Sequence, residues 1–302
     1  MPLPKSTLDQ LKIEAGEKFR IAHHHADWLP EPIRGLSKDE RKGRAEEMLA
    51  QNKVELAESQ ELLYADGRHA VLIVFQAMDA AGKDGTISHV MSGVNPQGCA
   101  VTSFKVPSAV EWSHDFLWRY SNALPARGMI GIFNRSYYEE VLVQKVHPEF
   151  LEKANLPPGS RHKNIWAHRY EDINNFEQHL ARSGTTILKF FLNVSKEEQR
   201  ERFLERLDHP EKNWKFSSSD IVERGYWDDY MAAFEEAINA TSTEWAPWYV
   251  IPADRKWAMR AVVSDIITTT IKGLDLEYPE LPESEMTRLD EAKAALLAEK
   301  SG

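Results

Sequence analysis

The sequence lacks several features that define common protein classes. It contains one cysteine, Cys99, among 302 residues, which excludes an internal disulfide framework and leaves no cysteine spacing for a metal site. No apolar run approaches the roughly 18 residues that a membrane span needs, and the first residues lack the apolar stretch of a signal peptide. No internal repeat or low-complexity segment is present. A cytoplasmic protein without a membrane partner is the simplest interpretation.

Positive charge is also scarce. The chain has 37 Lys and Arg residues against 47 Asp and Glu residues, a formal net charge of −10. Non-specific binding to nucleic acid needs a broad basic surface, so we do not expect it. A polyanionic substrate would require the basic residues to gather in one place. The hydrophobic fraction of 42%, with nine Trp and twelve Phe, is enough for a sizeable core.

Strand-like and helix-like segments alternate along most of the chain. We expect strands at 71–75, 100–104, 129–133, 185–192 and 248–251. We expect helices at 83–92, 109–124, 136–146, 196–207, 219–240 and 256–272. This alternation predicts an α/β fold in which helices cover both faces of a central parallel sheet.

The chain divides into three parts on the same reasoning. Residues 1–66 are expected to form an arm and helices packed on the core, and Ser37 with Glu40 fits a capping box that opens a long helix. Residues 67–275 are the expected catalytic domain, and residues 276–302 form an acidic tail with a helix. An insertion at about 147–170, with the basic run Arg161-His162-Lys163, is interpreted as an active-site lid.

The segment Leu72–Ile87, LIVFQAMDAAGKDGTI, has the order of a phosphate-binding loop: a buried strand, a Gly-Lys turn and a helix. Two positions differ from G-x-x-x-x-G-K-[ST], because Ala77 replaces the first glycine and Asp84 replaces the hydroxyl. Lys83 would neutralise phosphate oxygens during transfer. Asp79 would hold a hard cation, or orient or deprotonate an attacking phosphate. The alternative is a chance Gly-Lys, with Asp84 a favourable first-turn acid. The residues predicted to bind phosphate here are Ala81, Gly82, Lys83, Asp84 and Gly85.

A second polar cluster follows the strand expected at 129–133. Ligands of doubly wound sheets bind at the carboxyl ends of strands, and this strand ends in Asn-Arg-Ser. Asn134 stands where phosphate-binding-loop enzymes usually carry a second-strand acid, and Arg135 would face the phosphates with its planar fork. The alternative is structural: Ser136 and Glu139 fit a capping box, and Arg135 would pair with a surface acid.

The third cluster lies on the helix expected at 196–207. Arg202 and Arg206 are four residues apart and therefore share one face. Spacing alone favours a solvated face, on which Glu198 pairs with Arg202.

Six segments together resemble one family, the type 2 polyphosphate kinases: AMDAAGKDGTI, VTSFKVPS with HDFLWR, IFNRSYYEEVLV, KFFLNVSKEEQRERFLERLDHPEKNWKF, YWDDY and APWYVIPAD. They span roughly residues 70–270, and their order and number make the resemblance specific. Such enzymes reversibly transfer the terminal phosphoryl group of inorganic polyphosphate to a nucleotide, with Mg²⁺. The resemblance implies a P-loop-kinase-like three-layer sandwich with a helical lid and extra N-terminal helices, assembled as a homodimer or homotetramer.

The resemblance also implies roles for single residues. Asp79 would bind the metal and position the acceptor phosphate, while Lys83 and Arg135 would clamp the transferring group. Arg202 and Arg206 match positions that line the polyphosphate channel, which replaces the solvated interpretation of that helix. Two further matches are weaker: Lys215 for polyphosphate and Lys105 for the nucleotide.

Asn134 departs from the Asp-Arg-Ser of many family members. The form Asn-Arg-Ser-x-Tyr-Glu-Glu resembles the subgroup called class III, which accepts nucleoside monophosphates and diphosphates. Glu139 or Glu140 would then help to place the acceptor base. The implied metal ligands are Asp79 and Asn134, and Asp79 would carry most of the binding because Asn has no charge. The implied ligands are AMP, ADP, ATP or guanine nucleotides, with Mg²⁺ or Mn²⁺.

Two other functions stay open on the sequence. One is an ATP-dependent nucleotide kinase of the same fold, which would need a pocket for the donor base. The other is a non-catalytic module that binds polyphosphate or nucleotide, for which Lys83 and the arginines would suffice without Asp79.

Overall fold

The computed structural model describes residues 3–154, 156–157, 159–160 and 164–299. Its centre is a six-stranded sheet of order β1-β6-β5-β2-β4-β3, parallel throughout except for β1, which pairs antiparallel with β6. The strands are β1 (Lys12–Ile13), β2 (Ala70–Gln76), β3 (Cys99–Ser103), β4 (Ile130–Asn134), β5 (Thr185–Asn193) and β6 (Trp248–Pro252). The expected α/β class is confirmed.

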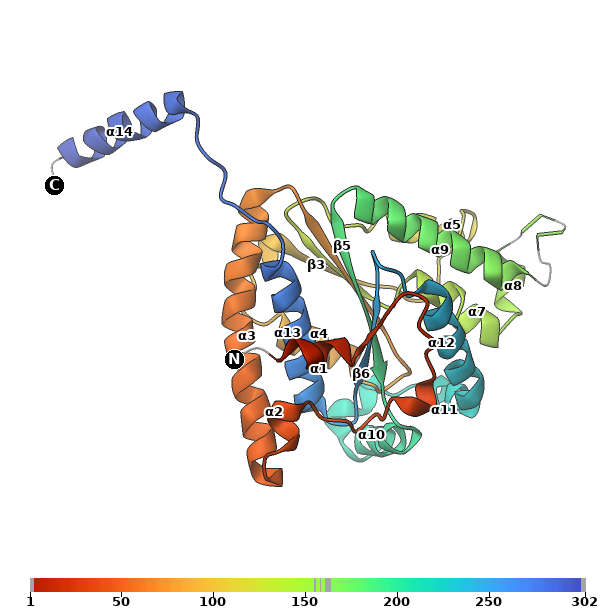
Figure 1. Cartoon of the computed structure of the whole chain (residues 1–302). Helices are drawn as coiled ribbons and strands as arrows, with labels where there is room; N and C mark the ends of the chain where they lie inside the picture. The colour runs from red at the N-terminus through yellow and green to blue at the C-terminus, as the bar shows by residue number, and fades with distance from the viewer. Residues whose placement is uncertain (1–2, 155, 158, 161–163, 300–302) are drawn as a thin grey trace.

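Helices cover both faces of this sheet (Figure 1). On one face lie α3 (Lys38–Asp66), α4 (Lys83–Val90) and α13 (Lys256–Lys272). On the other lie α7 (Val143–Val146), α9 (Ile165–Arg182) and α12 (Trp227–Thr241). The remaining helices are α1 (Lys5–Asp9), α2 (Glu31–Arg34), α5 (Ala109–Trp112), α6 (Trp118–Ser121), α8 (Phe150–Lys153), α10 (Lys196–Asp208), α11 (Ser218–Gly225) and α14 (Glu283–Ala298). Short 3-10 turns are η1 (Ile21–His23), η2 (Pro96–Gly98), η3 (Tyr137–Glu140) and η4 (Pro210–Lys215).

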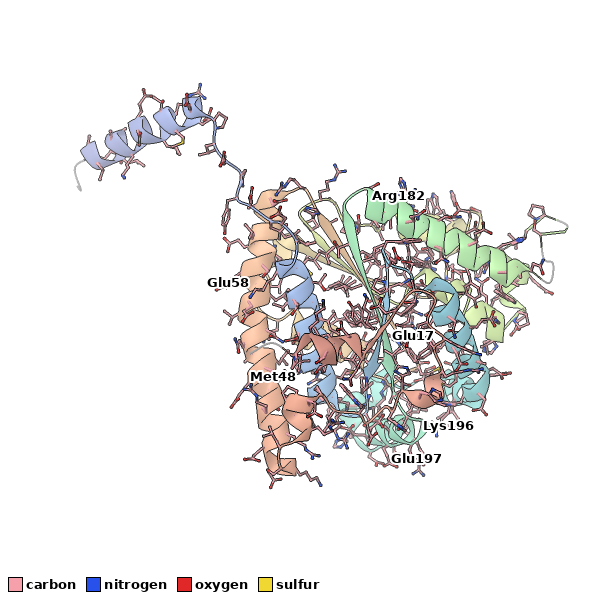
Figure 2. The ribbon with its side chains drawn as sticks, in the orientation of Figure 1. Glu17, Met48, Glu58, Arg182, Lys196 and Glu197 are labelled. Carbon is pink, nitrogen blue, oxygen red and sulfur yellow. The ribbon has the colours of Figure 1, made fainter. Side chains whose placement is uncertain are left out.

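β2 is the strand that positions the site. All seven of its residues are buried between β4 and β5, as expected of a continuous apolar run in a parallel sheet. Phe75 is level with Asn134 on β4 and with Phe190 on β5. The loops that follow β2 and β4 therefore leave the same edge of the sheet side by side. Lys196, labelled in Figure 2, marks the start of α10 at this edge.

The long helix α3 begins with the expected capping box of Ser37 and Glu40 and ends at Gly67, whose φ is +66°. Met48 is buried in the core, whereas Glu58 on the outer side of the helix is exposed (Figure 2). α3 packs along α13, where the buried Asn52 donates to Ser264 at 3.0 Å. The N-terminal segment is therefore built onto the core through α3, while α14 projects away from it (Figure 1).

Three expected helices are interrupted. The helix expected at 109–124 forms as α5 and α6, since Asp115 accepts the backbone N–H of Leu117 and competes with helical bonding between them. The helix expected at 219–240 breaks at Tyr226, directly after Gly225, into α11 and α12. These segments have helical patterns, but local side-chain bonds and a glycine shorten the helices.

The helix expected at 136–146 is also wrong in its first half. Ser136 accepts the N–H of Tyr138 and starts the 3-10 turn η3, so the capping box with Glu139 does not form. Glu139 instead accepts from Gln76 at 2.8 Å, which directs it toward the phosphate-binding loop. The sequence pattern gave no sign of this long-range contact.

Two elements were not anticipated, β1 and α9. β1 extends the sheet as an edge strand, and α9 begins within the segment interpreted as a lid and continues beyond it. The basic run Arg161-His162-Lys163 lies outside the described residues, and the assignment of 147–170 as a lid stays a prediction. None of the helices in the described ranges combines the length and the apolar character that crossing a bilayer demands.

A fully buried ion pair in the core joins Lys189 on β5 to Glu177 on α9 at 2.7 Å. Tyr137 and Tyr138 donate to the same carboxylate, and Lys189 also donates to the carbonyl of Thr241. Burial raises the pKa of Glu177 and lowers that of Lys189, while each partner opposes the shift of the other. The network ties η3, α9 and β5 together behind the end of β4, where the site begins.

Candidate active site

The loop between β2 and α4 has the geometry of an anion cradle. Ala80 has a φ of +60° and Gly82 one of +108°, so the chain turns sharply before Lys83 opens α4. The first N–H groups of a helix have no partner within it and favour an anion. A non-glycine residue in the left-handed region costs of order 1–3 kcal/mol, which the surroundings must offset. The expected Gly-Lys turn between strand and helix is present, and its binding of phosphate stays a prediction.

Arg202 holds this loop from behind. Its side chain is 4% exposed and all five of its N–H donors are used. Nε donates to Glu198 at 2.8 Å. The two terminal nitrogens donate to four backbone carbonyls, those of Ala80, Ala81, Ala253 and Asp254, at 2.6–3.1 Å. These bonds fasten the loop to the turn between β6 and α13. The expected pair with Glu198 forms, and a direct contact of Arg202 with polyphosphate stays a prediction.

Arg135 joins the second strand end to the loop. Its backbone has a φ of +65°, and its N–H donates to the carbonyl of Phe75. The guanidinium donates to Asp79 at 2.9 Å and pairs with Glu139 at 3.4 Å. The charges of Glu139 and Asp79 raise the pKa of Arg135. Ala80 and Arg135 are the non-glycine residues with a positive φ in the described ranges, and both lie here.

Lys83 lies inside the loop. Its ammonium donates to the carbonyl of Ala77 at 2.7 Å. Burial, followed by the charge of Arg135, lowers its pKa to about 8, although Asp79 and Glu139 oppose the shift. A nearby anion would favour the charged form of this lysine.

Asp84 and Asn134 form a pair between α4 and β4. The amide of Asn134 donates to the Asp84 carboxylate, and Ser103 lies 3.4 Å from the same amide nitrogen. Asp84 occupies the position of the usual loop hydroxyl, and Asn134 the position of the usual second-strand acid. Relative to the usual arrangement, the two groups are exchanged. The carboxylate, Asp84, is in the loop, and the neutral hydrogen-bonding group, Asn134, is at the end of β4.

The other predicted residues lie farther out. Arg206 is paired with Asp220 at 3.6 Å and lies over the ring of Phe203. Lys105 is exposed, and its carbonyl accepts from Arg119. The side chain of Lys215 lies outside the described part of the structure.

Several residues near the cluster were missed by sequence reasoning. Burial, followed by the charge of Asp79, raises the pKa of Asp220 on α11, which indicates that the two carboxylates are near each other. Tyr230 donates to Glu223 at 2.6 Å, and both line a small cavity of about 40 Å³ with Asp79. Spacing gave no signal for these contacts, since they depend on how α11 and α12 cross the loop.

A larger cavity of about 300 Å³ lies on the other side of η3. Aromatic and charged side chains line it, among them Trp112, Phe116, Glu140, Arg169 and Asp172. Arg169 lies over the Phe116 ring at 4.9 Å. Burial raises the pKa of Glu140 to about 7. Because Glu139 faces the loop and Glu140 faces the cavity, these adjacent acids connect the two.

The fold and the loop geometry together define an enzyme of the P-loop-kinase-like class. Residues 37–279 match the family described as polyphosphate kinase 2, and the chain belongs to this family.

Named relatives agree with this assignment. The chain is 54% identical over 259 residues to an "ADP-polyphosphate phosphotransferase" of Rhodopseudomonas palustris, covering 85% of this chain and 90% of that protein. It is 52% identical over 239 residues to an "AMP/ADP-polyphosphate phosphotransferase" of Meiothermus ruber, covering 79% and 85%. The crystal structure of polyphosphate kinase 2 from Arthrobacter aurescens superposes with a TM-score of 0.84 at 40% identity, covering 96% and 99% of the two chains.

The raised pKa of Glu140 predicts a pH-dependent stability. The folded chain keeps this proton up to about pH 7, whereas an unfolded chain releases it near the ordinary glutamate pKa of 4.5. The free energy of unfolding therefore falls as the pH rises through this window, by up to about 3 kcal/mol at 1.36 kcal/mol per pKa unit. In urea titrations, wild type should lose stability relative to Glu140→Gln between pH 5 and pH 8 by roughly this amount. An equal difference at both pH values would contradict the assignment.

Proposed function

We propose that the protein transfers the terminal phosphoryl group of inorganic polyphosphate to AMP or ADP. The observation that carries this proposal is the convergence of Asp79, Lys83 and Arg135 at the ends of β2 and β4, near a cavity of the size of a nucleobase site. The names of the relatives support the donor and both acceptors. A relative named as a GDP-polyphosphate phosphotransferase makes guanine nucleotides further candidate acceptors.

The acceptor base fits the aromatic cavity. Trp112 and Phe116 offer apolar surface for stacking, and Glu140 and Arg169 offer polar groups for the base or ribose. The acceptor phosphate would extend past η3 toward Arg135 and Lys83. Glu139 holds Arg135 in the required orientation.

In the reaction, an oxygen of the acceptor phosphate forms a bond to the terminal phosphorus of the polyphosphate chain. The anhydride bond behind that phosphorus breaks, and the shortened chain leaves with the electron pair. Lys83 and Arg135 neutralise the charge on the transferring oxygens, and Asp79 orients the acceptor. Because both cations are already fixed at the loop, little reorganisation is needed during transfer.

We further propose that Mg²⁺ is bound by Asp79 and Asp84. Mg²⁺ is usually held by one or two carboxylates together with substrate phosphates, and both carboxylates act on Lys83 at the loop. Within the described ranges, no three acidic, His or Cys side chains are grouped to hold a metal alone, which fits a site completed by substrate. Bound Mg²⁺ would polarise the phosphoryl oxygens. Asn134 orients Asp84 by its hydrogen bond.

The function is tested with polyphosphate as the sole donor. Wild-type enzyme with ADP and Mg²⁺ should form ATP, measured in a coupled assay, and Asp79→Ala should lower turnover by at least about 100-fold, the scale of one catalytic contact. Polyphosphate binding, measured by calorimetry, should survive in this variant. ATP-dependent phosphorylation of AMP without any use of polyphosphate would instead indicate an ordinary nucleotide kinase. Equal loss of binding and turnover would contradict the role of Asp79.

The Asp84–Asn134 pair gives a second test. Asp84→Asn should weaken Mn²⁺ binding in the presence of ADP, followed by electron paramagnetic resonance, and lower turnover by about 100-fold. The exchanged double variant Asp84→Asn/Asn134→Asp restores one carboxylate and one amide across the same gap. Its Mn²⁺ affinity and its turnover should each be at least about tenfold higher than those of Asp84→Asn. Recovery of turnover without recovery of Mn²⁺ binding would show that the pair only joins α4 to β4. A double variant as impaired as Asp84→Asn alone would contradict the exchange of roles between the two positions.

A further inference from the structure

Arg260 on α13 is a cation beside the phosphate-binding loop to which no role has been given. One of its terminal nitrogens would lie 3.4 Å from a Cβ atom placed on Gly85, in the first turn of α4. Its Nε is buried without a hydrogen-bond partner, and no carboxylate in the described ranges forms an ion pair with it. Burial and the neighbouring charge of Arg202 lower its pKa. Arg260 therefore directs an uncompensated charge at the edge of the loop.

More basic side chains continue from this point. Lys256 lies one turn earlier on the same face of α13, and its pKa is lowered by burial and then by Arg202. Its nearest carboxylate in an ion pair is Glu205, at 3.7 Å. Arg255 precedes it at the N-cap of α13. The rise along the helix from Arg260 to Arg255 is only about 7.5 Å, at 1.5 Å per residue.

Arg255 opens onto a cavity of about 460 Å³ at the start of α3. Its lining consists of four basic residues, one acid and one aromatic: Lys38, Arg41, Lys42, Arg255, Asp39 and Trp257. The Arg41 guanidinium bonds to the neutral carbonyls of Leu36 and Arg34, which leave its charge in place. We call Arg260, Lys256, Arg255, Lys38, Arg41 and Lys42 the basic strip.

Acidic neighbours offset part of this charge: Glu205 pairs with Lys256, and Asp39 lies in the cavity lining. Glu46 pairs with Lys42 at 3.7 Å and Asp27 with Arg255 at 3.8 Å, and these acids are 58% and 64% exposed. Exposed pairs of this kind contribute little and are readily exchanged for a stronger anion. In a chain of net charge −10, a continuous run of cations that starts at a phosphate-binding loop is a local exception.

The shape and chemistry of the strip select its ligand. A nucleoside triphosphate bound in the loop would place an apolar base beyond its phosphates, whereas the strip offers one aromatic ring among six cations. An anion whose charge repeats along its length matches it. Resting on the proposed function, we propose that the basic strip is a distal site for the polyphosphate donor. It is engaged only by chains long enough to reach from the loop to the start of α3.

Chain length gives the test. In Lys38→Gln/Arg41→Gln/Lys42→Gln, the KM for long-chain polyphosphate should rise about tenfold, the scale of several exposed charge contacts, with kcat unchanged. The KM of tripolyphosphate, or its inhibition constant if it is not turned over, should stay at the wild-type value. Arg260→Gln should weaken both donors, because Arg260 lies beside the loop itself.

Two controls keep the result interpretable. Arg182→Gln/Arg288→Gln/Lys293→Gln removes the same charge far from the strip, with Arg182 at the opposite end of the molecule (Figure 2), and should leave both constants unchanged. Lys38→Gln/Lys42→Gln retains Arg41 and its bonds at the start of α3, in case the triple variant does not fold.

A long-chain KM equal to wild type in both strip variants would overturn the proposal, even while wild type uses polyphosphate. An equal rise in the KM for tripolyphosphate would also overturn it. So would a triple variant that binds polyphosphate as wild type does but has lost affinity for a single-stranded oligonucleotide, because the strip would then serve a nucleic acid. Absence of turnover with any polyphosphate in wild type would instead count against the proposed function.

Discussion

The site depends on the guanidinium of Arg202. It donates to four backbone carbonyls, two in the loop after β2 and two in the turn after β6, and so joins these two turns through one buried cation. A lysine could not do this, since it lacks the planar fork and has three donors instead of five. The strained backbone of Ala80 is held in place by the same contacts.

Around this fixed loop the charges form separate regions with different tasks. Asp79, Lys83 and Arg135 influence one another's charge at the proposed point of transfer. The cavity beyond η3 is aromatic and suits a base, while the cations of α13 and α3 suit a repeating anion. A donor without a nucleoside needs no apolar pocket. In this account the −10 net charge and a polyanionic substrate are compatible because the loop cations and the basic strip form a local basic region.

The sequence alone predicted the parts that depend on local pattern. The buried run of β2, the Gly-Lys turn and the capping box of α3 follow from neighbouring residues, and the family resemblance agreed with them. It could not reveal that Arg202 bonds to turns more than fifty residues away, or that Asp220 approaches Asp79. Interrupted helices were missed for a related reason. Contacts such as that between Asp115 and Leu117 override a helical pattern without changing it.

The central claim is that the donor is held by charge alone, and its most direct test is the salt dependence of polyphosphate binding. We expect the affinity of wild type for long-chain polyphosphate, measured by calorimetry without nucleotide, to fall by at least about tenfold between roughly 50 and 200 mM salt. The logarithm of the binding constant should fall linearly with the logarithm of the salt concentration. An affinity that stays constant across this range would contradict recognition by a basic site.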